Sequence, residues 1–150
     1  MEASITALGN DGFDAVYSAN DGMAGGAIAA LKGASIDPAG RFVTGQDAEL
    51  AGIQRILTGE QLMTVYQPII DIAETSAEIA VPLAQGKQPP GDLAKDEVDN
   101  GQKKVPSDLL DTFAVQPDNI ESTVVKEGFL KTQDICTSKY RDACKKAGLE

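Results

Sequence analysis

Residues 13–31 read FDAVYSANDGMAGGAIAAL, a short extended run followed at once by a helical pattern. The extended part, residues 13–19, contains aromatic and β-branched residues, which favour a strand. The apolar residues of the helical part recur at the spacing of one helix face: Ala24, Ala27, Ile28 and Leu31. Asn20 stands at the junction, and Asp21 is predicted to cap the helix. The stretch therefore predicts a strand–helix unit with a polar residue at the carboxyl end of its strand.

The same arrangement recurs at two further places. Residues 42–45 run into Gln46-Asp47, and an apolar helical stripe follows over residues 50–57. Residues 62–66 run into Gln67-Pro68, and a third helical stripe continues to residue 83. Pro82 lies inside that third pattern, so we expect a kink or an early helix end there. Strands separated by helices of this length predict an α/β fold, with a parallel Rossmann-like sheet and right-handed crossovers.

Asn20, Asp47 and Gln67 each follow one of the three predicted strands. In an open α/β sheet, residues at the carboxyl ends of strands line the crevice where ligands bind. Two amides and one carboxylate can donate to and accept from several neighbouring hydroxyl groups. Asn20 and Asp47 also fit simple turn or helix-cap roles, as such residues commonly do. We favour a ligand role because the three residues end matching strands.

The composition excludes several classes of function. The 150 residues suffice for one domain with a sizeable core, and they include no histidine, which rules out a histidine-based catalytic triad or metal site. The sequence contains neither of the phosphate-binding motifs GxxxxGK and GxGxxG, nor the GxSxG motif that holds a nucleophilic serine. A net charge of −10 argues against nucleic acid and anionic membranes as partners. We therefore expect a protein that is no enzyme and uses no cofactor and no metal.

The character of the chain changes after residue 85. Residues 86–91 are predicted as a loop, and the mostly charged or polar residues 92–104 as a solvated surface loop. Extended pieces are expected over 105–110 and 112–115, a short helix from 118 to 125, and a last helix within 138–147. Tyr66 and Phe113 are predicted to belong to the core rather than to a stacking platform.

The two cysteines, Cys136 and Cys144, have two interpretations. Within a single helix they would stand about 12 Å apart, too far to form a disulfide. If Cys136 precedes the helix that holds Cys144, the chain can fold back and join them. The alternative is a pair of free thiols in a loose tail. We favour the disulfide, which implies an oxidising compartment.

Residues 14–32, 45–56 and 63–68 together resemble the periplasmic sugar-binding proteins of the ribose/xylose group. The Gly-Gln-Asp form of residues 45–47 and the Val-Pro-Ser of residues 105–107 resemble the D-xylose receptors of that group. The resemblance covers nearly all of residues 3–130. It implies a type I fold, with two Rossmann-like lobes that close on a monosaccharide, and a solute receptor of an ABC importer.

The resemblance also implies that Asn20, Asp47 and the position of Gln67 touch the sugar. One departure bears on which sugar is bound, because D-xylose receptors usually have lysine where this chain has Gln67, and ribose receptors have glutamine. The family resemblance therefore favours D-xylose and leaves the choice among sugars open.

Receptors of this group are about twice as long, so the chain resembles their carboxyl-terminal portion. Within it we expect second-lobe βα units at 1–68, a helix and loop returning to the first lobe at 69–104, crossover strands and a short helix at 105–135, and a disulfide-closed tail at 136–150. The implied partners are a monosaccharide, an ABC permease, and the absent amino-terminal half or a second copy of the chain. The implied location is periplasmic or extracellular, with lipoprotein anchoring as one form of it.

Two other classes of function compete with the receptor. A sugar-sensing effector domain of a transcription regulator, or of a chemosensor, would have the same fold. The expected disulfide and the long tail beyond residue 105 argue against the regulator. A phosphorelay receiver or an enzyme would use Asp21 and Asp47, but a receiver has lysine where this chain has Gln67. We find no nucleophile–base pair that supports an enzyme.

Overall fold

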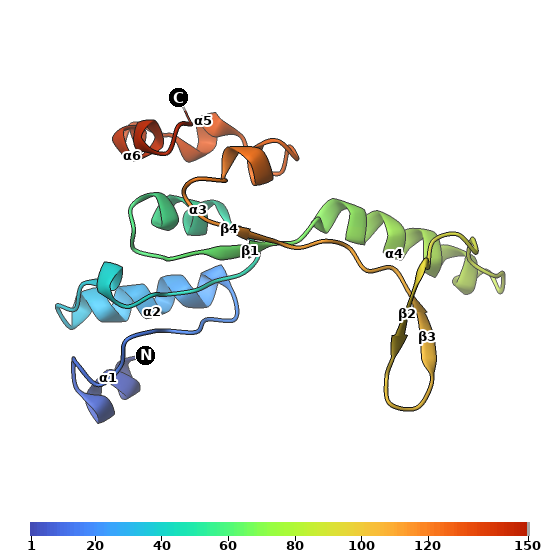
Figure 1. Cartoon of the computed structure of the whole chain (residues 1–150), viewed down its shortest axis with the longest axis horizontal. Coiled ribbons are helices and arrows are strands. Elements are labelled where there is room, and N and C mark those ends of the chain that lie inside the picture. The colour runs from blue at the N-terminus through green and yellow to red at the C-terminus, as the bar shows by residue number, and fades with distance from the viewer. Residues whose placement is uncertain (150) are drawn as a thin grey trace. The chain divides into compact units, whose positions relative to one another are not determined.

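A computed structural model describes residues 1–149, and these residues form two compact units (Figure 1). The first unit consists of residues 1–66 together with residues 113–149. The second unit consists of residues 67–112. The strand ends that carry Asn20 and Asp47 therefore belong to the first unit, and Gln67 is the first residue of the second.

The sheet of the first unit is built around β1 (Thr64–Tyr66), which pairs antiparallel with β4 (Phe113–Val115) (Figure 1). The two predicted strands that precede β1 are reduced in the structure to a single parallel bridge between Val16 and Val43. The backbone N–H of Leu62 donates to the carbonyl of Val43 at 2.8 Å, which links the second of these strands to the β1 segment.

The four segments thus lie in the order 13–19, 42–46, β1, β4. The parallel direction is confirmed for the first two segments. The antiparallel direction of β4 is a feature that the sequence did not predict.

Helices follow the strands of the first unit as predicted. α1 (Glu2–Leu8) precedes the first strand, α2 (Asp21–Gly33) follows it, and α3 (Leu50–Leu57) follows the second. A short 3-10 helix, η1 (Pro38–Gly40), lies in the turn after α2. The N-cap of α2 is Asn20 and not Asp21, so the predicted cap was wrong by one residue.

The first unit contains two clusters of buried apolar side chains. The first joins α2 to the strand at Val43 and consists of Ala24, Ile28, Leu31, Ile36 and Val43. The second joins α3, β1 and β4 to the tail and consists of Ala48, Ile53, Ile56, Tyr66, Val115, Ile120, Val124, Ile135, Cys144 and Leu149. The helix positions in both clusters follow the apolar spacing read from the sequence, because burial of that stripe is what fixes a short helix on a sheet.

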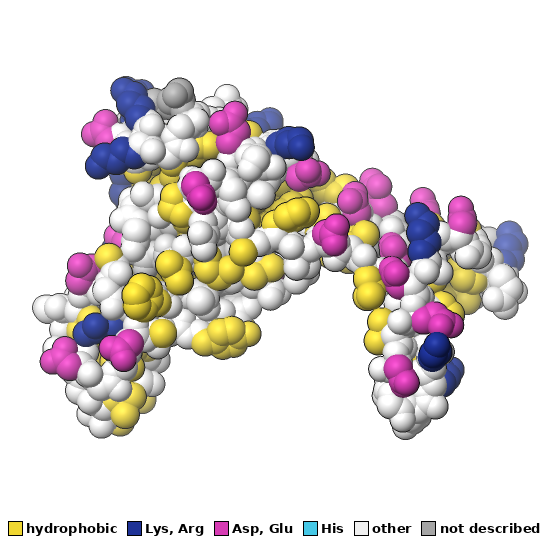
Figure 2. Space-filling view, in the orientation of Figure 1, with side chains coloured by type: hydrophobic (Ala, Val, Ile, Leu, Met, Phe, Trp, Pro, Cys, Tyr) yellow, Lys and Arg dark blue, Asp and Glu magenta, His cyan; other side chains and the backbone are white. Residues whose placement is uncertain are grey.

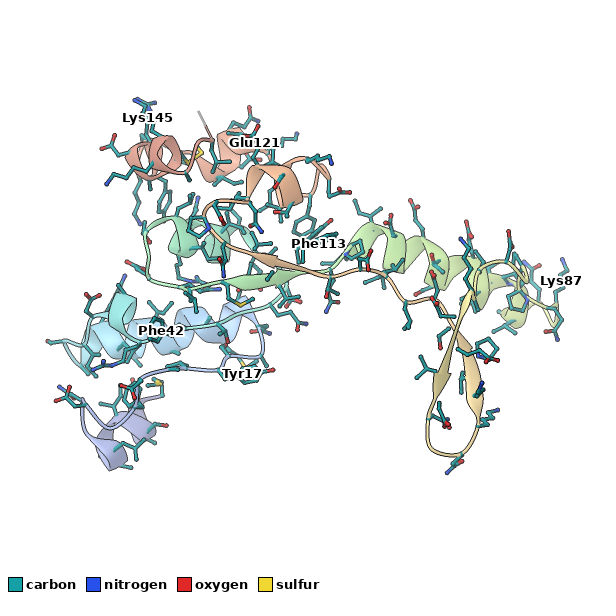
Figure 3. The ribbon with its side chains drawn as sticks, viewed as in Figure 1. Tyr17, Phe42, Lys87, Phe113, Glu121 and Lys145 are labelled. Carbon is teal, nitrogen blue, oxygen red and sulfur yellow. A yellow bond between two sulfur atoms is a disulfide. The ribbon has the colours of Figure 1, made fainter. Side chains whose placement is uncertain are left out.

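Of the two aromatic residues predicted in the core, one is confirmed and one is wrong. Tyr66 is buried and its ring lies 5.2 Å from that of Phe129. Phe113 is 44% exposed. It opens β4 at the boundary of the first unit, two residues before the buried Val115, so core side chains no longer cover it. Its aromatic ring is visible on the ribbon in Figure 3.

The tail contains three short helices, η2 (Glu121–Val125, one turn of π-helix), α5 (Thr132–Ile135) and α6 (Arg141–Lys146). A disulfide joins Cys136, which caps the end of α5, to Cys144 inside α6, with the two Cα atoms 5.9 Å apart (Figure 3). The predicted disulfide is therefore confirmed in the structure. Cys144 and Leu149 are buried against the second core cluster, so the disulfide closes a segment that packs on the domain.

Alkylation of the unreduced protein is expected to find no free thiol, because both cysteines are paired. Reduction should loosen residues 136–149 and leave the sheet intact, since the closed loop spans a separation of eight residues. Closing such a loop contributes roughly 2–3 kcal/mol in the chain-entropy model. The measurement is mass spectrometry after alkylation, followed by amide exchange of the tail with and without reductant. The Cys136→Ser, Cys144→Ser double variant is the control and should match the reduced protein; a reduced tail as well protected as the oxidised one would contradict the prediction.

The second unit consists of one helix and one hairpin. α4 (Ile69–Ala84) contains Pro82 and ends two residues after it, close to the early end predicted there. The hairpin pairs β2 (Asp96–Asp99) antiparallel with β3 (Lys104–Ser107). The acidic stretch predicted as a plain surface loop is thus exposed, as expected, but it is partly strand. Its turn is held by Asn100, whose side-chain oxygen accepts from the backbone N–H of Gln102 at 3.0 Å.

In the part of the chain that the structure describes, no helix has both the length and the apolar character needed to cross a bilayer.

Candidate functional site

The carboxyl ends of three neighbouring strand segments are tied together by backbone hydrogen bonds. The N–H of Asp21 donates to the carbonyl of Gln46 at 2.9 Å, which joins the end of the first segment to the end of the second. The N–H of Asp47 donates to the carbonyl of Val65 at 2.9 Å, which joins the second end to β1. Asn20 and Asp47 therefore lie at adjacent strand ends, on the edge of the sheet where ligands of α/β proteins bind.

Asn20 uses one half of its amide group within the protein. Its Oδ1 accepts a hydrogen bond from the N–H of Met23 at 2.8 Å and so caps α2. Its Nδ2 donates to no residue in the described range 1–149, and the side chain is half-buried. The predicted capping role thus accounts for the Asn20 side-chain oxygen, and its amide N–H groups remain available to a ligand.

Asp47 is not a helix cap. The N-cap of α3 is Glu49, and that helix has no side-chain cap hydrogen bond. The Asp47 carboxylate accepts no hydrogen bond from residues 1–149, although the side chain is half-buried. Asp47 and Ala48 both adopt left-handed backbone conformations, with φ of 90° and 51°. Such conformations are costly for residues other than glycine and are concentrated at functional sites.

Gln67 follows β1 directly in the chain and is partly buried. Its backbone carbonyl accepts from the N–H of Ile69 at 2.7 Å, at the start of α4. Gln67 belongs to the second unit, whereas Asn20 and Asp47 belong to the first. Its approach to the other two residues therefore stays a prediction.

The residue that sequence analysis missed is Asp21, which was assigned only a capping role. Asp21 is fully buried, and its carboxylate accepts three hydrogen bonds. Its Oδ2 accepts from the backbone N–H of Glu49 at 2.9 Å and from the hydroxyl of Thr64 at 3.0 Å. Its Oδ1 accepts from Nε2 of Gln61 at 2.6 Å. One side chain at the start of α2 thus contacts the segment after Asp47 and the first residue of β1.

Two glycines provide the space for this carboxylate. A Cβ atom at Gly45 or at Gly52 would collide with the Asp21 side chain. The sequence contained this signal, since a glycine ends the second strand and another interrupts α3, but the partner that required them was not evident.

Among residues 1–149 no group of three or more acidic or cysteine side chains is placed to hold a metal ion.

Comparison with known proteins places the chain in a family. Residues 1–88 match the family described as "Periplasmic binding protein domain". The chain is 47% identical over 136 residues to the D-xylose-binding periplasmic protein of Escherichia coli, covering 90% of this chain and 39% of that protein. It is 36% identical over 125 residues to the multiple sugar-binding periplasmic receptor ChvE of Rhizobium radiobacter, covering 81% of this chain and 35% of that receptor.

A solved structure shows the same fold. The carbohydrate transporter solute binding protein of Chloroflexus aurantiacus, in complex with D-glucose, superposes with a TM-score of 0.70 at 32% identity, covering 89% of this chain and 38% of that protein. The α/β class and the type I fold expected from the sequence are therefore confirmed. The chain spans about two fifths of the length of the relatives that it matches. Its first 88 residues, more than half of the chain, establish that it belongs to the periplasmic binding protein domain family.

Proposed function

We propose that this chain is part of the solute-binding component of an ABC sugar importer and contacts a monosaccharide, most favourably D-xylose, through Asn20, Asp47 and Gln67. The observation that carries the proposal is the pair of polar groups at adjacent strand ends. The Asn20 amide N–H groups and the Asp47 carboxylate have no partner within residues 1–149. The proposal is supported by 47% identity to the D-xylose-binding periplasmic protein of Escherichia coli.

The chemistry of these groups suits a polyhydroxylated ring. The Asp47 carboxylate can accept hydrogens from two neighbouring hydroxyl groups, and the Asn20 amide can donate to a hydroxyl oxygen. Gln67 can do both. Each hydroxyl group of a sugar needs both a donor and an acceptor when it leaves water, because an unpaired polar group is costly to bury. These three side chains therefore favour binding of an uncharged sugar.

The complete receptor, in this proposal, contains an amino-terminal portion ahead of Met1, and the sugar lies between two lobes. The coverage of 39% of the Escherichia coli protein supports a missing portion. Residues 1–68 then supply the sugar-contacting strand ends, residues 69–104 return to the first lobe, residues 105–135 cross between lobes, and residues 136–150 form the closed tail. The periplasmic relatives and the disulfide favour an exported receptor that delivers its sugar to an ABC permease.

Calorimetric titration of the complete receptor with D-xylose, D-ribose and D-glucose tests the proposal. We expect D-xylose to bind at micromolar strength or tighter, and at least about tenfold more tightly than the other two sugars. A preference for D-ribose would assign Gln67 its ribose-receptor role and overturn the choice of D-xylose. An absence of heat with every sugar of the panel would overturn the binding function itself.

A further inference from the structure

Asp21 is an acidic side chain that is completely withdrawn from solvent, at 0% exposure, next to the candidate site. All three hydrogen bonds to its carboxylate come from neutral donors, namely a backbone N–H, a hydroxyl and an amide. Burying a carboxyl group in this way costs more free energy than burying an apolar side chain of the same size. Stability alone therefore gives no reason for an acid at this position.

Several hydrogen bonds of Asp21 fix the backbone on either side of Asp47. Its carboxylate accepts directly from the N–H of Glu49, and it reaches the N–H of Ala48 through Thr64. The Thr64 hydroxyl accepts from that N–H at 3.2 Å and donates to Asp21 at 3.0 Å. The N–H of Asp21 itself donates to the carbonyl of Gln46. Three backbone groups within residues 46–49 thus depend on one residue of α2.

This segment needs such support because Asp47 and Ala48 are consecutive non-glycine residues at positive φ. A backbone in this region persists only when the surrounding structure holds it there. Arg55 in turn holds Asp21 and Gln61 in place. It donates from Nη2 to the carbonyl of Asp21 at 2.7 Å and from Nε to Oε1 of Gln61 at 3.0 Å. The backbone that carries the Asp47 side chain is therefore held by contacts of its neighbours as well as by the hydrogen bond from its own N–H to Val65.

We propose that Asp21 is a positioning residue for sugar recognition: acting with Thr64, its buried carboxylate holds residues 46–49 in the conformation that presents Asp47 to the ligand. The proposal deepens and rests on the proposed sugar-binding function. Asp21 touches no ligand in this scheme. Its effect on affinity passes through the backbone at Ala48 and Glu49.

Four variants of the complete receptor test this. Asp21→Asn keeps the shape and one acceptor oxygen but replaces the other oxygen with an NH2 donor. Either Gln61 on one side, or Glu49 and Thr64 on the other, then loses its acceptor. Thr64→Val removes the hydroxyl that links Ala48 to Asp21, and Thr64→Ser keeps it. Thr123→Val is the matched control, because Thr123 is also a buried threonine and its hydroxyl donates to the carbonyl of Asn119 at 2.6 Å, in the tail segment and outside this network.

We expect Asp21→Asn and Thr64→Val to weaken D-xylose binding by about tenfold in calorimetry, while Thr64→Ser and Thr123→Val stay within about threefold of the wild type. Amide exchange by NMR should show Ala48 and Glu49 exchanging about tenfold faster than in the wild type, while the buried Ile36, whose N–H donates to the carbonyl of Leu31, is unchanged. Thr123→Val should lower the melting temperature without either effect.

Wild-type affinity in both Asp21→Asn and Thr64→Val would overturn the positioning role. An equal acceleration of exchange at Ile36 would do the same, since it would mean general destabilisation. If the wild-type receptor binds no sugar, the proposed function fails. The exchange rates of Ala48 and Glu49 still decide whether Asp21 holds the segment.

Discussion

Replacing Asp47 by alanine in the complete receptor is expected to raise the dissociation constant for D-xylose by about tenfold to a hundredfold. A carboxylate that accepts hydrogens from two sugar hydroxyls makes charge-assisted bonds worth roughly 1.5–3 kcal/mol each. In the structure this carboxylate accepts no hydrogen bond from residues 1–149 and does not cap α3. Its loss therefore removes no hydrogen bond within the described part of the protein. Calorimetric titration with melting curves of both proteins measures the effect.

The control for Asp47→Ala is Asp37→Ala. Asp37 is also an aspartate in the first unit, and its carboxylate caps η1 by accepting from the N–H of Ala39 at 3.1 Å. That variant should lose a little stability and keep its sugar affinity. An Asp47→Ala receptor that binds D-xylose as the wild type does would remove Asp47 from the site.

Asn20 permits a sharper test than truncation. Asn20→Ala removes both the amide that we propose contacts the ligand and the cap of α2, so lower affinity would not be separable from lower stability. Asn20→Asp retains an oxygen to accept from Met23 and replaces the NH2 donor with a charged acceptor oxygen. We expect Asn20→Asp to weaken binding with little change in melting temperature. Gln67→Ala should weaken binding less than Asp47→Ala does, because the amide is neutral.

The helices of this fold could be predicted because a single stripe of apolar residues determines them. The spacing of Ile28 and Leu31 in α2, and of Ile53 and Ile56 in α3, is the spacing of the buried positions observed. The first strand was located from the aromatic and β-branched residues of its extended run. The antiparallel direction of β4 could not be predicted, because the sequence of a three-residue strand does not determine which neighbour it pairs with.

The site was predictable only as far as strand ends can be located. Asn20 and Asp47 were placed at adjacent ends by counting strands and helices. The left-handed backbone at Asp47 and the buried contacts of Asp21 depend on residues far apart in the chain, since Asp21 reaches Gln61 and Thr64 across more than 35 positions. An Asn-Asp pair before a helix looks the same in sequence whether the aspartate faces solvent or lies buried.

Residues 1–150 alone are expected to be an oligomer or poorly folded, and to bind D-xylose no more tightly than millimolar. The first unit exposes large apolar side chains around its first strand and α2, and hydrophobic groups (yellow) are visible on this part of the surface in Figure 2. Tyr17 is 90% exposed, Met23 55% and Phe42 56%; Tyr17 and Phe42 are labelled in Figure 3. Tyr17 and Val16 belong to a strand segment that is bridged on one side to Val43. A partner that supplies the amino-terminal portion would cover this surface.

A sugar bound to residues 1–150 alone would also lack the contacts that the amino-terminal portion is expected to provide. In the proposed site, the polar side chains of this chain pair hydroxyl groups on one side of a ring only, and the closing lobe that is expected to exclude water and pair the other side would be absent. Light scattering and calorimetry of residues 1–150, before and after the amino-terminal portion is supplied, measure both consequences. Supplying it should yield a monomer and raise the affinity for D-xylose by about a thousandfold, from millimolar to micromolar. A compact monomer of residues 1–150 that binds a pentose at micromolar strength would show that these residues are sufficient for binding. Oligomer formation would then not be needed to cover Tyr17, and a second lobe would not be needed to enclose the sugar.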